Sequence, residues 1–221
     1  MHFRSFFYYF DRYVFPPFCQ SCRVFLSENR PFCAECTVRL KRPLTQDYKL
    51  SSGKTVTLYA AAAYADEVRR LVCAKQYKQV AAAHLLGILA LELAPCPWRE
   101  FDFLLPVPLH WTRFYWRGFN QALIIAQEIE KGTECPVIQP LYRYKKTRYQ
   151  ATLSADLREQ NVCAAFAFKN LEAQKQCVGK SILLVDDVIT TGATVASIAQ
   201  LLYRAGASRV ACVAAARAFY S

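Results

Sequence analysis

The sequence predicts an α/β fold in which helices flank a mostly parallel sheet, with a small metal-binding module at the N-terminus. Three observations predict this fold: apolar strand-like runs alternate with helical segments, one such run near the C-terminus ends in two acids, and two cysteine pairs precede residue 40. With 221 residues, 54% of them hydrophobic, the chain can form one medium domain and an appendage. We place the module at residues 1–50 and the α/β domain at residues 51–221.

The first 18 residues are rich in aromatic side chains at helical spacing, but charged residues interrupt them. They lack the continuous apolar stretch of a signal peptide. We expect an amphipathic helix that packs on its own protein; a helix lying on a membrane surface is the alternative. The best candidate for a membrane span, Leu85–Leu93, is short and carries Glu92, so we do not expect an integral membrane protein.

Strands and helices alternate along the rest of the chain. The run Ser181–Asp186 is rich in Ile, Leu and Val, which is typical of a parallel strand buried on both faces. Gly206 is expected to cap the last helix. The predicted strands are Thr55–Tyr64, Phe101–Pro106, Val137–Leu141 (the weakest), Ser181–Asp186 and Val210–Ala215, and the predicted helices are Asp66–Tyr77, Ala81–Leu93, Gly118–Lys131 and Thr194–Ala205.

Four of the ten cysteines form two C-x2-C pairs, Cys19 with Cys22 and Cys33 with Cys36. Each pair can sit on a tight knuckle that directs both thiolates at one tetrahedral zinc ion. Four ligands leave no open position, so the pattern predicts a structural zinc site that folds the module. The other cysteines stand among apolar neighbours and are predicted to be buried small hydrophobes in a reducing compartment, the cytoplasm. They are Cys73, Cys96, Cys135, Cys163, Cys177 and Cys212.

The segment Leu183–Thr194 is the main functional motif. A buried strand is expected to deliver Asp186 and Asp187 to its carboxyl end, where open α/β sheets bind ligands. The loop that follows offers N–H groups, threonine hydroxyls and a helix N-terminus to a phosphate monoester, and Gly192 lets the main chain approach it. Carboxylates beside a phosphate suggest a sugar phosphate, with the acids on ribose hydroxyls or on magnesium. An acidic turn before an ordinary capped helix is the alternative.

These twelve residues resemble the 5-phosphoribosyl-1-diphosphate (PRPP) signature of type I phosphoribosyltransferases. The resemblance implies that Asp186 and Asp187 hold the ribose hydroxyls and that magnesium accompanies PRPP. The 5-phosphate would lie against Thr190, Thr191, Gly192, Ala193 and Thr194.

Three further segments, Leu104–His110, Arg117–Gln121 and Thr147–Asn161, extend the resemblance. Together with the cysteine pairs they resemble the ComF/GntX family, bacterial proteins associated with natural competence for DNA uptake. This resemblance covers the chain from about Cys19 to Val213 and implies a zinc finger joined to a phosphoribosyltransferase-like domain. Arg23 departs from the family pattern, because many relatives have glycine there.

Similarity to amidophosphoribosyltransferases implies roles for two of these regions. A turn formed by Pro106, Val107, Pro108 and His110 would bind the diphosphate, and Arg113 and Arg117 would add bidentate contacts. A second stretch would be the mobile loop that closes over the substrate. Its polar members are Arg143, Lys145, Lys146, Arg148, Gln150 and Arg158.

The second stretch also has a rival interpretation. Tyr142, Tyr144 and Tyr149 alternate with its cations, a pattern suited to stacking bases and binding a phosphate backbone. A solvated basic loop without a partner is a third interpretation. The formal net charge of +11 favours a polyanionic partner but does not choose between nucleic acid and a phosphorylated small molecule.

Three functions remain open from the sequence. We favour a competence protein that binds PRPP and single-stranded DNA and acts in DNA uptake in the cytoplasm or at the inner face of the membrane, with proteins of the import machinery as further partners. The alternative is an active magnesium-dependent phosphoribosyltransferase of unknown acceptor, with His84 or His110 as candidate bases. The third is a zinc-stabilised adaptor with a vestigial loop, against which the intact Asp-Asp and Thr-Thr-Gly-Ala-Thr elements argue.

Overall fold

A computed structural model describes residues 17–40, 45–73, 78–109, 115, 118–144 and 165–218. Almost all of the predicted N-terminal aromatic helix lies outside these residues, as does Cys163. The same holds for His110, Arg113, Arg117 and the stretch 145–158.

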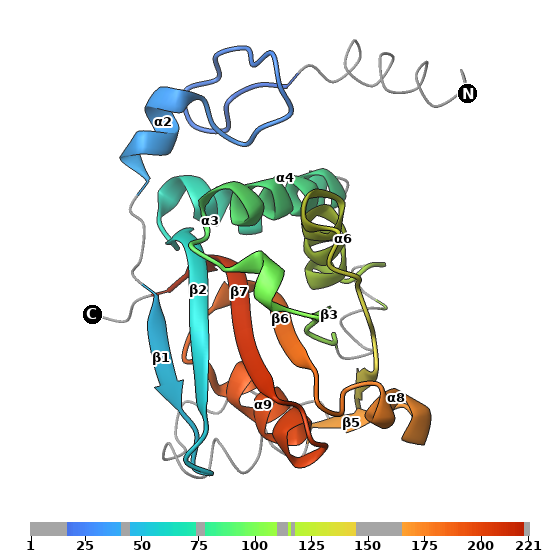
Figure 1. Ribbon diagram of the computed structural model, residues 1–221. Coiled ribbons are helices and arrows are strands. Elements are labelled where there is room, and N and C mark those ends of the chain that lie inside the picture. Colours follow the sequence, from blue (N-terminus) through green and yellow to red (C-terminus); the bar gives the residue numbers. More distant parts are fainter. Residues whose placement is uncertain are drawn as a thin grey trace.

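The centre of the molecule is a five-stranded sheet in the order β1-β2-β7-β6-β3 (Figure 1). Its strands are β1 (Gln46–Lys49), β2 (Thr55–Ala63), β3 (Phe103–Pro106), β6 (Ser181–Ile189) and β7 (Arg209–Arg217). Only the edge strand β1 runs antiparallel to its neighbour; β2, β7, β6 and β3 pair in parallel. The predicted α/β class with a mostly parallel sheet is therefore confirmed.

The runs 182–185 of β6 and 210–216 of β7 are apolar and buried without interruption because both faces of these strands are covered. Alternate residues point to opposite sides, so Leu183 and Val185 enter one core layer while Ile182 and Leu184 enter the other. The first layer is covered by α3 (Asp66–Val72), α4 (Lys78–Leu93) and α6 (Gln121–Thr133). The second is covered by α9 (Ala193–Arg204) and by a small sheet of β4 (Leu141–Arg143) and β5 (Phe166–Phe168), which α8 (Leu171–Lys175) adjoins.

The cysteine-rich segment 17–40 contains one short helix, α2 (Ala34–Arg39), and lies beside α3 and α4 (Figure 1). Cys19, Phe32 and Cys36 are buried and belong to the same core cluster as the first helical layer. Arg30 also reaches α4, where its Nε lies 3.2 Å from a carboxylate oxygen of Glu92. The module is thus packed on the α/β domain, and β1, which precedes residue 50, is a strand of the central sheet.

Several predicted elements differ from the structure. Val137–Leu141 is not a regular strand: Val137 forms a single parallel bridge with Leu104, and Leu141 begins β4. The strand predicted to end at Asp186 continues to Ile189, because β7 still offers pairing partners there.

The helix predicted over Asp66–Tyr77 ends at Val72, with Cys73 as its C-cap, and residues 74–77 lie outside the described part of the chain. Cys73 is exposed, contrary to the prediction of burial, because it occupies this helix end. Cys96, Cys135, Cys177 and Cys212 are buried as predicted. Within the described ranges, no helix has the length and apolar character needed to span a bilayer.

Candidate functional site

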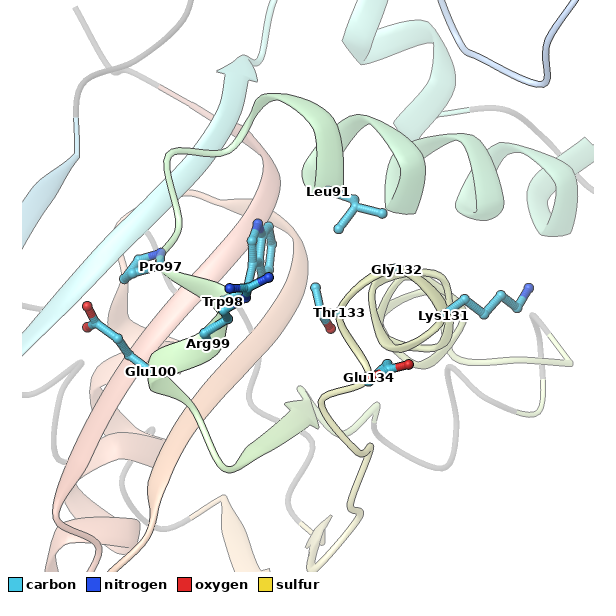
Figure 2. A pocket seen from close by; sticks show the side chains of 9 residues that line it. All are labelled: Leu91, Pro97, Trp98, Arg99, Glu100, Lys131, Gly132, Thr133 and Glu134. Carbon is cyan, nitrogen blue, oxygen red and sulfur yellow. The ribbon is translucent and has the colours of Figure 1, made fainter.

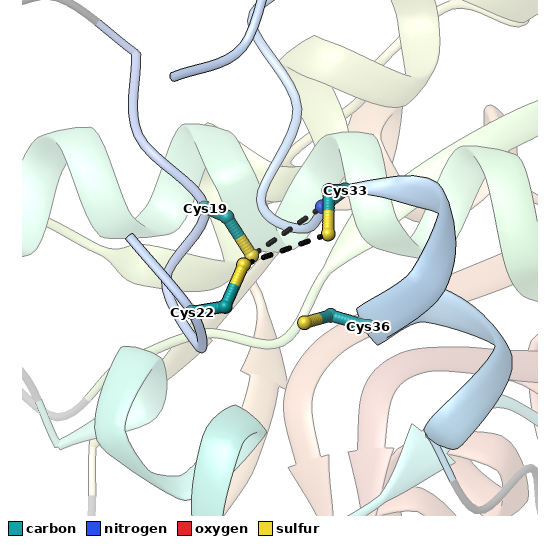
Figure 3. Close-up of side chains that lie close together, drawn as sticks. All are labelled: Cys19, Cys22, Cys33 and Cys36. Atoms are coloured by element: carbon teal, nitrogen blue, oxygen red, sulfur yellow. Dashed lines mark hydrogen bonds between the residues drawn. The ribbon is translucent and has the colours of Figure 1, made fainter. Parts of the chain in front are cut away.

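The four paired cysteines converge on one point (Figure 3). Their Sγ atoms all lie within 4.8 Å of one another, and those of Cys22 and Cys33 are 3.7 Å apart. Sulfurs placed about 2.3 Å from a tetrahedral zinc ion are about 3.8 Å from each other. The predicted ligand set is therefore brought together, and its size and chemistry fit a zinc ion.

Local backbone geometry positions the first cysteine pair. The Cys19 N–H donates to the carbonyl of Val24 at 2.9 Å, and the Arg23 N–H donates to the carbonyl of Cys19 at 3.0 Å. Arg23 closes this turn with a φ of 65°, in the left-handed region. In the second pair, Cys33 is the N-cap of α2 and Cys36 lies in its first turn, so both thiols project from one helix end.

The thiols of the cluster ionise unequally. Burial opposes ionisation of Cys19, but N–H groups of Cys33, Cys22 and Ser21 outweigh it and lower the Cys19 pKa to about 6. Burial, together with the neighbouring thiols, raises the pKa of Cys36 to about 12. A bound cation favours thiolate at every ligand. The cluster thus holds one thiolate readily, and a metal ion would favour thiolate at the other three cysteines.

The second candidate site lies at the carboxyl ends of the parallel strands. Asp186 and Asp187 lie in the second half of β6, and Thr190, Thr191 and Gly192 lead into α9. Gly192 has a φ of 79°, which a residue without Cβ adopts readily. Because α9 begins at the next residue, the N–H groups of its first turn face the loop, and that of Ala193 donates to Thr191 Oγ1 at 3.4 Å. The predicted phosphate loop therefore has the backbone form that suits an anion.

The two carboxylates of this site are held close together by backbone hydrogen bonds. Asp186 Oδ1 accepts the N–H of Asp187 at 2.9 Å, and Asp187 Oδ1 accepts the N–H of Val188 at 2.8 Å. Burial and the charge of Asp187 raise the pKa of Asp186 well above its ordinary value. The charge of Arg143 opposes this shift. Such a pair gains from a cation or from hydroxyl donors, which are the groups that magnesium and a ribose supply.

The predicted diphosphate turn adjoins the acidic pair. Pro106 pairs with Val185, the residue before Asp186, and the Val107 N–H donates to the carbonyl of Val185 at 2.9 Å. Asn120 caps α6 and donates from Nδ2 to the carbonyl of Val107 at 3.1 Å. The structure therefore brings the Pro106–Pro108 turn, the start of α6 and the acidic strand into one region.

Arg143 lies in β4, where its guanidinium packs 5.3 Å from the centre of the Phe166 ring. It is partly buried, whereas Tyr142 and Tyr144 on either side are exposed. The other polar members of the predicted mobile loop lie outside the described residues.

Tyr64 and its surroundings were missed by the sequence analysis. Its N–H donates to the carbonyl of Arg217 at 2.7 Å, and its hydroxyl lies 3.2 Å from Cys73 Sγ. The Cys73 thiol, burial and, more weakly, the charge of Asp187 raise the Tyr64 pKa. The available signal was its position, since Tyr64 is the first polar residue after the apolar strand β2 and so stands at the ligand-binding edge of a parallel sheet.

A separate hollow of about 730 Å³ lies at the opposite end of the sheet (Figure 2). Leu91, Trp98 and Thr133 line it from α4, the short helix η1 (Trp98–Glu100) and α6. It lies near the amino ends of β3 and β7, where Glu100 pairs with Arg209. None of the predicted site residues lines it.

Comparison with known proteins agrees with this arrangement. Residues 118–218 match the family described as phosphoribosyl transferase domain. DNA utilization protein YhgH of Escherichia coli K12 is 43% identical over 111 residues, covering 49% of this chain and 46% of that protein. Competence protein F of Haemophilus influenzae is 35% identical over 118 residues, covering 53% of this chain and 51% of that protein. Adenine phosphoribosyltransferase of Stutzerimonas stutzeri is 38% identical over 94 residues, covering 42% of this chain and 46% of that protein.

The fold and the matched domain define a protein of the phosphoribosyltransferase type. The chain is similar to DNA utilization protein YhgH and to competence protein F over about half of its length, which supports the predicted resemblance to the ComF/GntX family. The chain spans about half the length of the curated relatives that it matches.

Proposed function

We propose that this protein binds magnesium-PRPP at the carboxyl end of β6 and acts in the handling of single-stranded DNA during DNA uptake. The observation that carries the first part is the acidic pair Asp186–Asp187, held by backbone N–H groups directly before a glycine-containing loop and a helix N-terminus. A pair of partly buried carboxylates is unfavourable alone and is relieved by a cation or by hydroxyl donors. Phosphate binding by the adjacent loop makes a phosphorylated sugar the ligand that satisfies both halves.

Roles follow from position along the site. Thr190–Thr194 would hold the 5-phosphate and the two aspartates would hold the ribose hydroxyls, as the family resemblance implies. Pro106, Val107 and Pro108 would face the diphosphate from the neighbouring strand end, joined by His110, Arg113 and Arg117. Magnesium would screen the charge between the diphosphate and the carboxylates.

The DNA part of the proposal is supported by the homologues, whose names refer to DNA utilization and competence. Those names support a competence-related role for this chain. The formal net charge of +11 suits a polyanionic partner. We place the protein in the cytoplasm or at the inner face of the membrane, in contact with the import machinery, and we assign a structural zinc ion to Cys19, Cys22, Cys33 and Cys36.

The test of the PRPP site is calorimetric titration of magnesium-PRPP into zinc-replete protein. The double variant Asp186→Asn, Asp187→Asn should lose at least about 100-fold in affinity, because it removes two charge-assisted contacts. Asp102→Asn is the matched control: Asp102 lies before β3 and bonds to the first residue of β6, so PRPP affinity should stay unchanged. Equal affinity in the wild type and the double variant would show that the acidic pair does not form the site.

The alternative function is an active phosphoribosyltransferase, favoured by the match of residues 118–218 to that domain family. Transfer would release diphosphate as an acceptor attacks C1 of the ribose. A coupled diphosphate assay with nucleobases and amines as acceptors separates the two functions. PRPP binding without diphosphate release would favour a binding protein over an enzyme.

A further inference from the structure

The two-stranded sheet of β4 and β5 presents different side chains on its two faces. In its antiparallel register Tyr142 lies opposite Ala167 and Arg143 lies opposite Phe166. Directly paired residues share a face, and successive residues alternate between faces. Arg143 and Phe166 therefore face the domain, whereas Tyr142, Ala167 and Tyr144 belong to the other face.

Two aromatic rings lie side by side on this outer face. Tyr142 and Tyr144 are 45% and 49% exposed, and their ring centroids are 6.1 Å apart at an interplanar angle of 53°. Two other tyrosines are used by the fold: Tyr59 is buried, and the Tyr203 hydroxyl donates to the carbonyl of Thr55 at 3.0 Å. Ala167, opposite Tyr142, is too short to cover a ring. The outer face therefore offers accessible π-faces.

Positive charge accompanies these rings. The Lys169 N–H donates to the carbonyl of Pro140 at 2.9 Å, which extends the ladder by one pair and places exposed Lys169 on the same face as Tyr142. In the sequence, Lys145 and Lys146 directly follow Tyr144. Aromatic rings next to cations are the combination that binds single-stranded nucleic acid through base stacking and phosphate contacts.

The size of the patch argues for nucleic acid over a protein partner. A stable protein interface needs about 800 Å² on each side, and two half-exposed tyrosines and a lysine supply only a fraction of this area. A nucleobase needs only one ring face, so each tyrosine can receive one base.

We infer that Tyr142, Tyr144 and Lys169 form a stacking surface for consecutive bases of single-stranded DNA. This inference rests on the DNA part of the proposed function and adds a location to it. Arg143 lies on the opposite face, where it packs on the Phe166 ring, and its positive charge opposes the rise in the Asp186 pKa. The two ligands thus use different side chains of one ribbon, and their affinities can be altered separately.

The experiment compares two double variants by fluorescence anisotropy with a labelled oligothymidylate of about 20 nucleotides, longer than a typical binding site. Tyr142→Leu with Tyr144→Leu keeps apolar bulk but removes the π-faces, and should lose at least about 30-fold in affinity. Tyr142→Phe with Tyr144→Phe keeps the rings and should stay within about threefold of wild type. Lys169→Gln should remove one phosphate contact. The slope of the logarithm of DNA affinity against the logarithm of salt concentration should then become shallower by about 0.7.

Controls separate this surface from the PRPP site. Both double variants should keep wild-type PRPP affinity by calorimetry and a melting temperature within about 5 °C of wild type, because about half of each replaced side chain is exposed. Equal oligothymidylate binding by the leucine variant and the wild type would overturn the stacking surface but leave DNA as a partner. Absence of oligothymidylate binding by the wild type would overturn both the surface and the DNA part of the proposed function, while the PRPP titration would still report on the other part.

Discussion

The cysteine module and the acidic loop both gather ionisable groups, but they relate to the fold in opposite ways. Between residues 17 and 40 the ordered structure comprises a six-residue helix and one antiparallel bridge, so the four thiols that would hold a metal also hold the segment together. At the loop, Leu183, Leu184 and Val185 are fully buried and fix the strand, while Asp186 is held next to Asp187 at a cost. Groups that support the fold indicate a structural site, and groups that strain it indicate a ligand site.

The largest effect that tests this contrast should come from removing one thiol. Cys36→Ser should reduce bound zinc from one ion per chain to almost none, because metal binding and folding of such a module are one equilibrium worth about 10 kcal/mol or more. Amide protons of Arg23 and Thr37, which bond to Cys19 and Cys33 carbonyls, should lose protection from exchange. Amide protons of β6 should keep theirs. Zinc content and hydrogen exchange together measure this outcome.

Cys177→Ala is the matched control, because Cys177 is also a buried thiol but does not belong to the four-cysteine cluster. The Cys177→Ala protein should keep one zinc ion per chain. If Cys36→Ser instead exposed β6 and β7 to exchange, the module and the α/β domain would be a single cooperative unit. The cysteine cluster would then stabilise the whole protein, and the acidic loop would not fold independently of it.

The second prediction concerns the pH dependence of stability. Burial and Asp187 raise the pKa of Asp186 in the folded protein, so its contribution is favourable below the ordinary pKa of 3.8 and is lost as pH rises through the raised folded pKa. Asp186→Asn should therefore stabilise the metal-free protein at neutral pH by about 1 kcal/mol or more, because it removes a desolvated charge next to Asp187 and each unit of raised pKa corresponds to about 1.4 kcal/mol. The gain should vanish in acid. Urea unfolding without magnesium measures it.

Asp102→Asn supplies a control with the opposite sign. The N–H of Ser181 and the ammonium of Lys180 lower the pKa of Asp102, so its contribution is present above pH 3.8 and is lost as pH falls through the lowered folded pKa. This variant should be less stable than the wild type at neutral pH. If Asp186→Asn were also destabilising at neutral pH, the acidic pair would be a structural element and its assignment to a ligand site would lose its physical basis.

The sequence predicted the parts of this molecule whose signals are local. Strands β6 and β7 and helix α9 were predicted from long apolar runs and helical periodicity, and the cysteine spacing identified the ligand cluster. Strands β1, β4 and β5 were missed because they have only three or four residues and depend on pairing with distant segments. The same reason hid the influence of the Arg143 charge on the pKa of Asp186, because the two residues lie 43 positions apart in the sequence and only the tertiary fold brings them within electrostatic range.

The two faces of β4 show this limit most clearly. In the sequence, Tyr142, Arg143 and Tyr144 are neighbours within one basic, aromatic stretch, for which a substrate loop and a DNA-binding loop were alternatives. Only the strand conformation separates the tyrosines from the arginine, because period-two alternation sends them to opposite faces. In our proposal the DNA-binding alternative therefore applies to the two tyrosines, and the substrate-loop alternative applies to Arg143.

The smallest predicted effect concerns Arg23, at a position where the ComF/GntX pattern that this chain resembles often has glycine. Its φ of 65° lies in the left-handed region, where a residue with a Cβ is less stable by about 1–2 kcal/mol. Glycine removes this strain, but it loses more backbone entropy on folding, which offsets part of the gain. Arg23→Gly should therefore stabilise the metal-bound turn by about 1 kcal/mol relative to Arg23→Ala, which removes the charge but keeps the strain. Because the metal folds the module, this difference should appear as about fivefold tighter zinc binding in competition with a chelator. Equal zinc affinity in the glycine and alanine variants would mean that the backbone at Arg23 is not strained. The cysteine module would then contain no strained group, in contrast to the acidic pair.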